Sequence, residues 1–437
     1  MERFEDASGF RGQAERRLIP RDERGLVQIL TEANRTRTPI TIAGGWTGLT
    51  GGSVPLDGWL VSLNKFCNIQ VGSGRVIAGA GVSLKELQTA CGPRQFYAPD
   101  PTENTATIGG TIATNASGSR SFRYGSTRAH VLALKVAFID GQVRTFHRGE
   151  AIDFDVAALP IPNTTKYTAG YPLRPGMDWI DLLVGSEGTL GIVIEAELRL
   201  LPTPEELLAG VVFFRNDAEA LEAVQAWRSI PSLRMLEYFD RNSLRLLRTR
   251  YSEVPEQAGT ALLIEQEGPD LDALEDRITG DSWFALSDTD RERFRQFRHA
   301  LPEMVNEIMR RRGFLKLGSD YAVPLDRNRE MLAFYHDRLK GFDYVIFGHI
   351  GDAHPHVNLL PGTPEQFDAG KEIMLEFARE GVRLGGTVSA EHGLGKRKAH
   401  LLGIQYTTDP IDAMRAVKRR LDPQWLIGRG NLFAMPV

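Results

Sequence analysis

Cysteine is scarce in this chain of 437 residues, which contains only 2, Cys67 and Cys91. Two thiols cannot make the disulfide framework of a small secreted protein, and the count suits a reducing compartment. Long apolar runs are missing too, because each is interrupted within about ten residues, whereas a membrane-spanning helix needs about 20. The opening segment MERFEDASGFRGQAERR lacks the apolar core of a signal peptide. We therefore expect a cytoplasmic protein with no transmembrane segment, and leave open a peripheral attachment to a membrane.

An excess of one charge is also missing. The 52 Lys and Arg residues nearly balance the 56 Asp and Glu residues, for a formal charge of −4. This balance argues against binding of nucleic acid through bulk electrostatics. Apolar residues make up 42% and charged residues 25% of the chain, which is typical of a globular protein. At about 150 residues per domain, the length predicts two or three domains.

The common nucleotide-binding fingerprints GxGxxG and GxxxxGK[ST] are absent. Glycine is nevertheless abundant, at 44 residues. It gathers in three segments, GGWTGLTGGSVP (44–55), PDPTENTATIGGTIATNASGSRSFRYG (99–125) and VGSEGTLGIV (184–193). Such a loop can offer consecutive backbone N–H groups to an anion such as a pyrophosphate, although any single one is equally well a surface loop. Three of them beside predicted strands indicate one extended ligand, such as a dinucleotide.

Local patterns predict the order of helices and strands. In the first half we expect a helix over 24–36 and strands at 40–43, 75–79, 131–139, 142–146 and 192–200, with Asp140-Gly141 as a hairpin turn. Pro202 and Pro204 mark a domain boundary. In the second half we expect helices near 217–228, 290–310, 327–339 and 364–382, and strands near 207–214, 232–239, 261–267, 314–323 and 344–358. This alternation predicts an α+β domain with a mixed or antiparallel sheet.

Two segments of the second half carry candidate metal ligands. The first, FGHIGDAHPHVNLLP (347–361), reads as a hairpin whose tip is Asp352-Ala353, which would place His349 opposite His356. Directly opposed side chains have Cβ atoms about 4.5–5.5 Å apart, which suits two ligands of one metal, although a polar pair in a core fits as well. The second, GGTVSAEHGLGKRK (385–398), adds Glu391 and His392 between glycines. One carboxylate and two imidazoles suit Zn²⁺, Mn²⁺ or another divalent ion.

The segments PITIAGGWTGLTGGSVP, PDPTENTATIGGTIATNASGSRSFRYGSTRAHVL and LLVGSEGTLGIVIEAELRLLP resemble the FAD-binding (PCMH-type) domain of the vanillyl-alcohol oxidase type. The branch that they resemble most contains the flavin subunit of glycolate oxidase, D-lactate dehydrogenase and D-2-hydroxyglutarate dehydrogenase. The resemblance implies a two-domain α+β fold, with the FAD-binding domain over 1–203 and a substrate-binding cap over 204–437. It leaves open whether the C-terminal segment, about 421–437, returns to the first domain.

The resemblance implies that the three glycine-rich loops hold FAD. The first would line the pyrophosphate through Gly44, Gly45, Thr47, Gly48, Gly51 and Gly52. The second would follow the isoalloxazine and ribityl portion through Pro99, Thr107, Gly109, Gly110, Thr114, Asn115, Gly118 and Tyr124. The third would reach the adenosine end through Glu187, Gly188 and Ile192.

Two features of the first loop bear on how FAD would be held. Trp46 stands where the family has glycine, so its side chain must point away from a phosphate. Relatives that link FAD covalently often use a histidine in this loop, but the nearest candidates here are His130 and His147, far downstream. We therefore expect non-covalent FAD.

The resemblance also assigns the remaining site residues. The family segments GHxGDGNxHxN and GxxSGEHGxG imply that His349, His356 and Glu391 bind a divalent metal, with Zn or Mn the favoured ions, and that His392 is the catalytic base. FRQFRHALPE (294–303) matches a segment whose arginine binds the substrate carboxylate, here Arg298, and a looser match in FLKLGSDYAVP (314–324) points to Lys316. A guanidinium suits bidentate binding of a carboxylate.

Several positions depart from the family pattern. Asp352-Ala353 replaces an Asp-Gly turn, and because alanine resists the positive φ of a tight turn, a wider loop is favoured. His354 replaces an asparagine and is open to three interpretations: a group behind the metal ligands, a substitute ligand or an exposed residue. Ala390 replaces a glycine. In LDPQWLIGRGNLF (421–433), Asp422, Pro423 and Gly430 match the family, whereas its asparagine, proline and lysine are replaced by Gly428, Arg429 and Asn431.

Together these features predict an FAD-dependent enzyme that oxidises a D-2-hydroxy acid with the help of a divalent metal. A metallohydrolase built on the histidines and Glu391 is one alternative, but it has no use for three glycine-rich loops. A non-catalytic or partner-dependent flavin protein within a larger oxidase complex is another. The particular acid, the electron acceptor (O₂, a quinone, a flavoprotein or a cytochrome) and the assembly, as a homodimer or with partner subunits, stay open.

Overall fold

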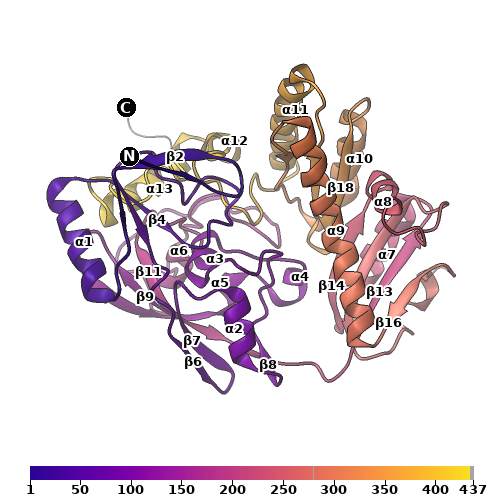
Figure 1. Cartoon of the computed structure of the whole chain (residues 1–437), viewed down its shortest axis with the longest axis horizontal. Helices are drawn as coiled ribbons and strands as arrows, with labels where there is room; N and C mark the ends of the chain where they lie inside the picture. Colours follow the sequence, from indigo (N-terminus) through magenta and orange to yellow (C-terminus); the bar gives the residue numbers. More distant parts are fainter. Residues whose placement is uncertain (279, 434–437) are drawn as a thin grey trace.

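The computed structural model describes residues 1–278 and 280–433. Two lobes of mixed helix and sheet lie side by side, with the first half of the chain in one lobe and residues 207–383 in the other (Figure 1). Among the described residues, no helix combines the length and apolar character needed to cross a membrane.

The first lobe is built on two main sheets. An antiparallel sheet has the strand order β10-β9-β11-β7-β6, with β6 (Ile69–Gly72), β7 (Arg75–Gly79), β9 (Val131–Ala137), β10 (Val143–His147) and β11 (Ile192–Arg199). A parallel sheet has the order β3-β5-β4, with β3 (Arg16–Leu18), β4 (Ile40–Ala43) and β5 (Trp59–Ser62). Two further pairs are β1 (Glu2–Glu5) with β2 (Arg11–Ala14), and β8 (Gln95–Phe96) with β12 (Leu201–Pro202).

Helices cover these sheets, and the strands predicted for this half are confirmed. The helices are α1 (Glu23–Thr36), α2 (Leu84–Cys91), α3 (Ile108–Thr114), α4 (Ser121–Tyr124), α5 (Thr127–His130) and α6 (Trp179–Leu183). Helix α1 begins where the Asp22 side chain accepts a hydrogen bond from the Gly25 amide, and it buries the apolar face that the spacing predicts. The predicted hairpin turn is also present, with Gly141 at φ +86°.

The second lobe is one antiparallel sheet of seven strands in the order β16-β13-β15-β14-β18-β19-β17. These are β13 (Leu207–Phe214), β14 (Leu233–Phe239), β15 (Thr260–Glu267), β16 (Trp283–Ala285), β17 (Leu317–Gly318), β18 (Tyr344–His349) and β19 (His354–Leu359). Its helices are α7 (Asp217–Trp227), α8 (Arg241–Arg248), α9 (Asp288–Arg312), α10 (Asn328–Arg338) and α11 (Pro364–Arg383), with 3₁₀ turns at Glu275–Arg277, Leu325–Arg327 and Ile350–Asp352. A further 3₁₀ turn at Ala399–Leu401 belongs to the segment after α11. The strand predicted over 314–323 shrinks to β17, because the segment after it turns inward to meet the loop around Glu391.

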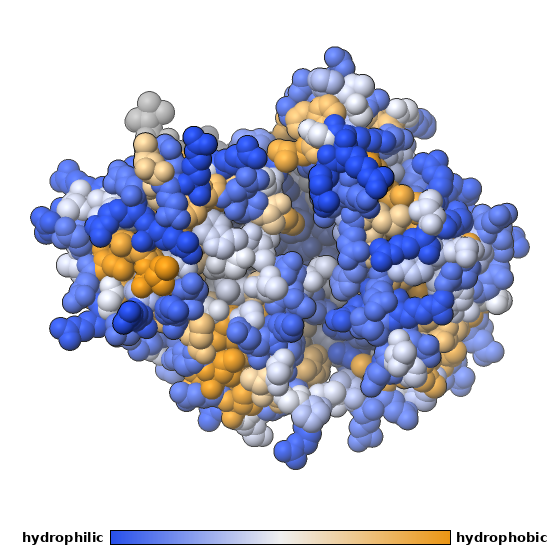
Figure 2. All heavy atoms as spheres, viewed as in Figure 1, coloured by the Kyte–Doolittle hydropathy of each residue, from blue (hydrophilic) through white to orange (hydrophobic). Residues whose placement is uncertain are grey.

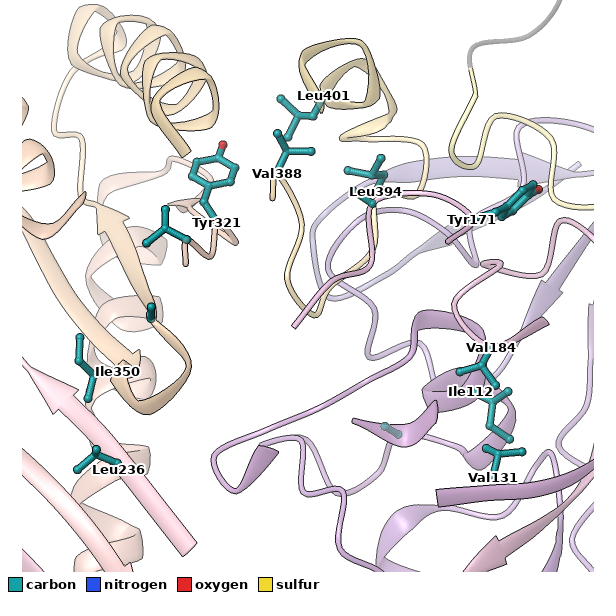
Figure 3. Packing of buried hydrophobic residues seen from close by; sticks show 14 of the residues in the cluster. Ile112, Val131, Tyr171, Val184, Leu236, Tyr321, Ile350, Val388, Leu394 and Leu401 are labelled. Carbon is teal, nitrogen blue, oxygen red and sulfur yellow. The ribbon is translucent and has the colours of Figure 1, made fainter. Parts of the chain in front are cut away.

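After α11 the chain returns to the first lobe, where α12 (Leu402–Gln405) and α13 (Thr408–Leu421) lie (Figure 1). The return begins near Ser389, whose carbonyl accepts a hydrogen bond from the Thr168 amide, and it ends with the Gly428 amide bonded to the Ile40 carbonyl. Figure 3 shows apolar side chains of this segment lying between those of the two lobes. More of the C-terminus therefore packs on the first lobe than the stretch from 421 considered in the sequence.

An ion pair in the second lobe links stability to pH. His336 on α10 places Nε2 2.9 Å from the Asp217 carboxylate at the start of α7, and its Nδ1 lies 3.1 Å from the Tyr344 hydroxyl. Burial lowers the pKa of His336, but the hydrogen bond and charge of Asp217 outweigh it and raise that pKa above its ordinary value. The stabilisation is therefore complete below the unfolded-state pKa of about 6.5 and is lost as pH rises through the folded-state pKa.

We expect His336→Gln to lower the melting temperature more at about pH 6 than at about pH 9, because the charged imidazole is present only at the lower pH. Thermal unfolding of both proteins, followed by circular dichroism at the two pH values, measures this difference. An equal loss at both pH values would show that the imidazole acts through packing alone.

Candidate active site between the lobes

A cavity of about 1320 Å³ lies between the lobes and is lined by residues of both. Figure 2 shows the face of the molecule hollowed at this boundary. All three glycine-rich loops contribute to the lining, as do the segments that carry the predicted histidines and Glu391. The cavity therefore brings the expected cofactor loops and the expected metal ligands to one place.

Of the residues predicted to bind the cofactor, the structure places most in the cavity wall: Gly44, Gly45, Thr47, Gly48, Gly52, Thr107, Gly109, Gly110, Thr114, Gly118, Glu187, Gly188 and Ile192. Gly51, Pro99, Asn115 and Tyr124 are not in the described lining. Asn115 instead accepts a hydrogen bond from the Arg128 amide at 2.9 Å, and the Tyr124 hydroxyl donates to Glu267 at 2.7 Å. These two side chains stabilise the loop and its contact with the second lobe.

Close packing around the first glycine-rich loop explains why glycine is needed within it and in the segment that contacts it. A Cβ on Gly45 would lie 2.7 Å from the Thr105 carbonyl oxygen of the second loop. A Cβ on Gly395, beyond Glu391, would lie 2.2 Å from the Thr50 carbonyl oxygen. Trp46 fits because its ring stacks on Phe4, with ring centroids 5.5 Å apart.

Glu187 joins the third loop to the segment around Glu391. Its carboxylate accepts hydrogen bonds from the Leu394 and Gly395 amides at 2.7 and 2.6 Å, and burial raises its pKa to about 7. This side chain therefore anchors the segment that carries Glu391 against the first lobe.

The histidine hairpin has a different register from the predicted one. His349 pairs with His354, and Phe347 pairs with His356. The predicted register is wrong, whereas the wider loop is confirmed: residues 350–352 form a 3₁₀ turn, and Ala353 takes φ +49°. The shift is two residues, so His349, His354 and His356 still lie on one face of the sheet.

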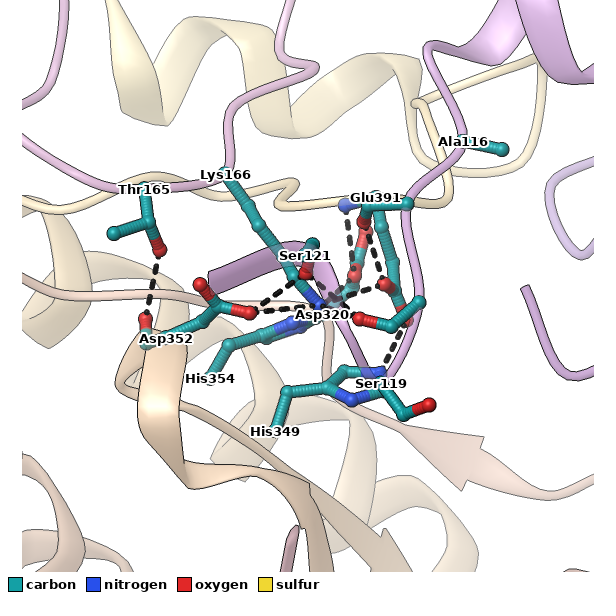
Figure 4. Close-up of polar contacts among 12 residues, drawn as sticks. Ala116, Ser119, Ser121, Thr165, Lys166, Asp320, His349, Asp352, His354 and Glu391 are labelled. Carbon is teal, nitrogen blue, oxygen red and sulfur yellow. Dashed lines mark hydrogen bonds and ion pairs between the residues drawn. The ribbon is translucent and has the colours of Figure 1, made fainter. Parts of the chain in front are cut away.

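Glu391 faces this cluster. Its Oε1 lies 3.1 Å from His349 Nε2, 3.2 Å from His356 Nε2 and 3.7 Å from His392 Nε2. Its other oxygen accepts hydrogen bonds from Ser117 at 2.9 Å and from the buried Lys166 ammonium at 3.1 Å (Figure 4). One carboxylate oxygen is therefore occupied by fixed donors, and the other points at three imidazoles.

Oxygen atoms behind the histidines orient their rings. Glu237 lies 2.5 Å from His349 Nδ1, and the Ser319 carbonyl lies 3.1 Å from His356 Nδ1. Both contacts hold a proton on Nδ1 and leave Nε2 facing Glu391, which is how metal-binding histidines are commonly oriented. The residues present thus fit a divalent ion.

Asp320 organises the segment that carries His392. It accepts hydrogen bonds from the His392 amide at 3.0 Å and from the Ser389 hydroxyl at 2.8 Å, and His392 Nδ1 lies 3.4 Å from it. Burial lowers the pKa of His392 to about 4, although the charges of Asp320 and Glu391 oppose this shift. The imidazole is therefore neutral near pH 7 and able to accept a proton.

The two predicted substrate-binding cations also line the cavity. Arg298 donates from Nε to Glu237 at 2.7 Å and from a terminal nitrogen to Thr102 at 3.1 Å, so it bridges the lobes. Lys316 is partly buried, and its pKa is lowered by this burial and by the charge of Lys398.

Sequence reasoning missed Glu237, Lys166 and Asp320. Glu237 had a visible signal, since it is a carboxylate within the apolar strand LRMLEYF, all of which is buried. The segments TTKYTAG around Lys166 and LGSDYAV around Asp320 contain no comparable sequence signal. The residues that surround these two side chains in the fold come from segments far away in the chain.

Glycine-rich loops that share a cavity with imidazoles and a carboxylate indicate a two-domain enzyme that binds a cofactor. Two family descriptions match the chain: "FAD binding domain" over residues 14–147 and "FAD linked oxidases, C-terminal domain" over residues 203–432. The chain belongs to the FAD-linked oxidases.

Relatives match nearly the whole chain. A glycolate oxidase subunit GlcD of Bacillus subtilis is 30% identical over 95% of this chain and 88% of that protein. A D-2-hydroxyglutarate dehydrogenase of Xanthomonas citri is 29% identical over 95% and 88%, and a D-lactate dehydrogenase of Archaeoglobus fulgidus is 29% identical over 94% and 90%. Among solved structures, an alkyldihydroxyacetonephosphate synthase has a TM-score of 0.64 at 17% identity, covering 94% of this chain and 75% of that one, which shows a shared fold.

Proposed function

We propose that this FAD-linked oxidase converts a D-2-hydroxy acid of the glycolate, D-lactate or D-2-hydroxyglutarate class to the 2-oxo acid. One observation carries the proposal: His349, His356, Glu391 and His392 line the same cavity as the three glycine-rich loops. A proton acceptor and a set of metal ligands thus face the space expected for the flavin. The names of the relatives support the substrate class.

His349, His356 and Glu391 would hold a divalent ion, for which Zn²⁺ and Mn²⁺ are the leading choices. Their imidazole and carboxylate donors match the preferences of such ions, and the ligand atoms of this cluster lie within 4.8 Å of one another. Such an ion would supply Lewis-acid chemistry, polarising the hydroxyl oxygen of the substrate and making its proton more acidic.

The protein's own groups position the substrate and move its proton. Arg298 binds the substrate carboxylate, and Lys316 adds positive charge to the same wall of the cavity. His392, neutral near pH 7, takes the hydroxyl proton. FAD held by the three glycine-rich loops would supply the hydride acceptor for C2 of the substrate.

Reduction of the bound flavin by substrate tests this function directly. We expect a D-2-hydroxy acid to bleach the flavin absorbance under anaerobic conditions, and to support turnover with a dye as acceptor in a screen of glycolate, D-lactate, D-malate and D-2-hydroxyglutarate. The L-enantiomers of the chiral acids are the matched control. A flavin that none of these acids reduces would contradict the proposal and favour a flavin protein that depends on a partner.

The cofactor itself is predicted to be non-covalent. His349, His356, His392 and His400 are the histidines in the described cavity lining, and none lies in the three glycine-rich loops. Acid or heat should therefore release the flavin into the supernatant, where its absorbance is measured. Yellow colour that stays with the precipitated protein would contradict this expectation, and a colourless protein that FAD cannot reconstitute would contradict the choice of cofactor.

A further inference from the structure

His354 is the most unusual side chain of the cluster. It is completely buried, and both of its ring nitrogens lack a hydrogen-bond partner among the described residues. Nε2 lies 3.2 Å from the Asp320 carboxylate, but without hydrogen-bond geometry. A buried polar group without a partner is destabilising, so a ligand that supplies a partner for this ring would stabilise the fold.

The position of His354 excludes an exposed role and brings it among the predicted ligands. Its ring centroid lies 5.5 Å from that of His349 and 4.4 Å from that of His356. One ring nitrogen lies within 4.8 Å of ligand atoms of His349, His356 and Glu391. Figure 4 shows its ring beside that of His349, on the side that faces Glu391 and Lys166.

We propose that His354 is a fourth protein ligand of the divalent ion, completing a set of three imidazoles and one carboxylate. The inference rests on the proposed function, since it concerns the same metal site. It is specific to this chain, because the resembling family carries an asparagine at this position. A bond to the ion would give a partner to one of the two ring nitrogens that the protein leaves without a hydrogen bond.

A set of four protein ligands limits which divalent ions can also bind the substrate. In a tetrahedral Zn²⁺ site all four positions would be filled by protein, and none would remain for substrate. An octahedral ion would keep two positions, which matches the two oxygens, carboxylate and hydroxyl, that a 2-hydroxy acid offers. The site therefore favours an ion that accepts six ligands, such as Mn²⁺ or Co²⁺, for substrate binding.

Counting the imidazoles on the metal tests the proposal without measuring turnover. The FAD-loaded, full-length protein is stripped of metal and loaded with Co²⁺ alone. X-ray absorption then gives the number of imidazole ligands, and visible ligand-field bands report coordination number, since six-coordinate Co²⁺ absorbs weakly and four-coordinate Co²⁺ strongly. We expect three imidazoles and weak bands in the wild-type protein.

The decisive variant is His354→Asn, which introduces the residue of the resembling family. We expect two imidazoles, shifted ligand-field bands and Co²⁺ affinity at least about 10-fold weaker in chelator competition. His147→Asn, on the exposed face of β10, should match the wild-type protein in all three. Retained flavin absorbance shows that each variant is folded.

The outcomes separate this inference from the proposed function. Two imidazoles in the wild-type protein would overturn the fourth ligand while leaving the metal site intact, even if His354→Asn failed to fold. Weaker affinity with an unchanged imidazole count in His354→Asn would also overturn it, because His354 would then act only behind the ligands. If His356→Asn bound Co²⁺ as the wild-type protein does, the proposed metal site itself would be wrong, and the fourth ligand with it.

Discussion

Replacing His392 with alanine is expected to slow reduction of the bound flavin by about 10²–10⁴-fold, the usual loss for a missing general base. FAD and metal contents should stay unchanged. The reason is geometric and electrostatic: His392 lines the cavity, and its backbone amide and ring are both held by Asp320. Burial keeps the imidazole neutral near pH 7, with a pKa of about 4, so its lone pair is available to the substrate hydroxyl.

Stopped-flow reduction of the flavin by saturating substrate measures this step apart from reoxidation. His147→Ala serves as the control, because it removes an exposed histidine far along the chain from the cluster. If His392→Ala reduced its flavin at the wild-type rate, the base assignment would be wrong. His392 would then be a side chain that packs beside the ligands.

Structural features that depend on local sequence, such as loops, helices and strands, could be predicted. Features that depend on contacts between distant parts of the chain could not. The glycine-rich loops were recognisable because close approach of backbones selects glycine, as at Gly45 against Thr105. Most helices and strands followed from local spacing. The hairpin register did not, since it depends on the length of the turn, which includes a 3₁₀ turn over 350–352 before Ala353.

In the candidate site, too, only some residues could be predicted from local sequence. Short segments with a distinctive residue type and spacing contain His349, His356, Glu391 and His392. Their supports come from elsewhere: Glu237 is 112 residues away from His349 in the chain, and Lys166 is 225 residues away from Glu391. No local pattern links such pairs, so only the folded chain reveals that a buried lysine neutralises the outer oxygen of Glu391.

That arrangement makes Glu391→Ala the substitution with the broadest expected effect. Removing the carboxylate deletes the oxygen that faces three imidazoles, so metal affinity should fall by more than the roughly 10–100-fold typical of losing a supporting group. Turnover should fall with it. Lys166 would keep Asp352 at 3.4 Å as its charge partner, which should limit the loss of stability below the roughly 3–5 kcal/mol expected for an unpaired buried charge.

Ser117→Ala is the matched control, because it removes only a 2.9 Å hydrogen bond to the outer oxygen and leaves the inner one in place. Metal analysis, chelator competition and thermal unfolding of both variants, compared with the wild-type protein, separate loss of a ligand from loss of a support. Glu391→Ala should lose metal and keep FAD, since Glu391 lies outside the three glycine-rich loops that are expected to hold the flavin. A Glu391→Ala protein with full metal content and a normal rate of flavin reduction would mean that the carboxylate serves only to pair with Lys166 and the histidines inside the fold.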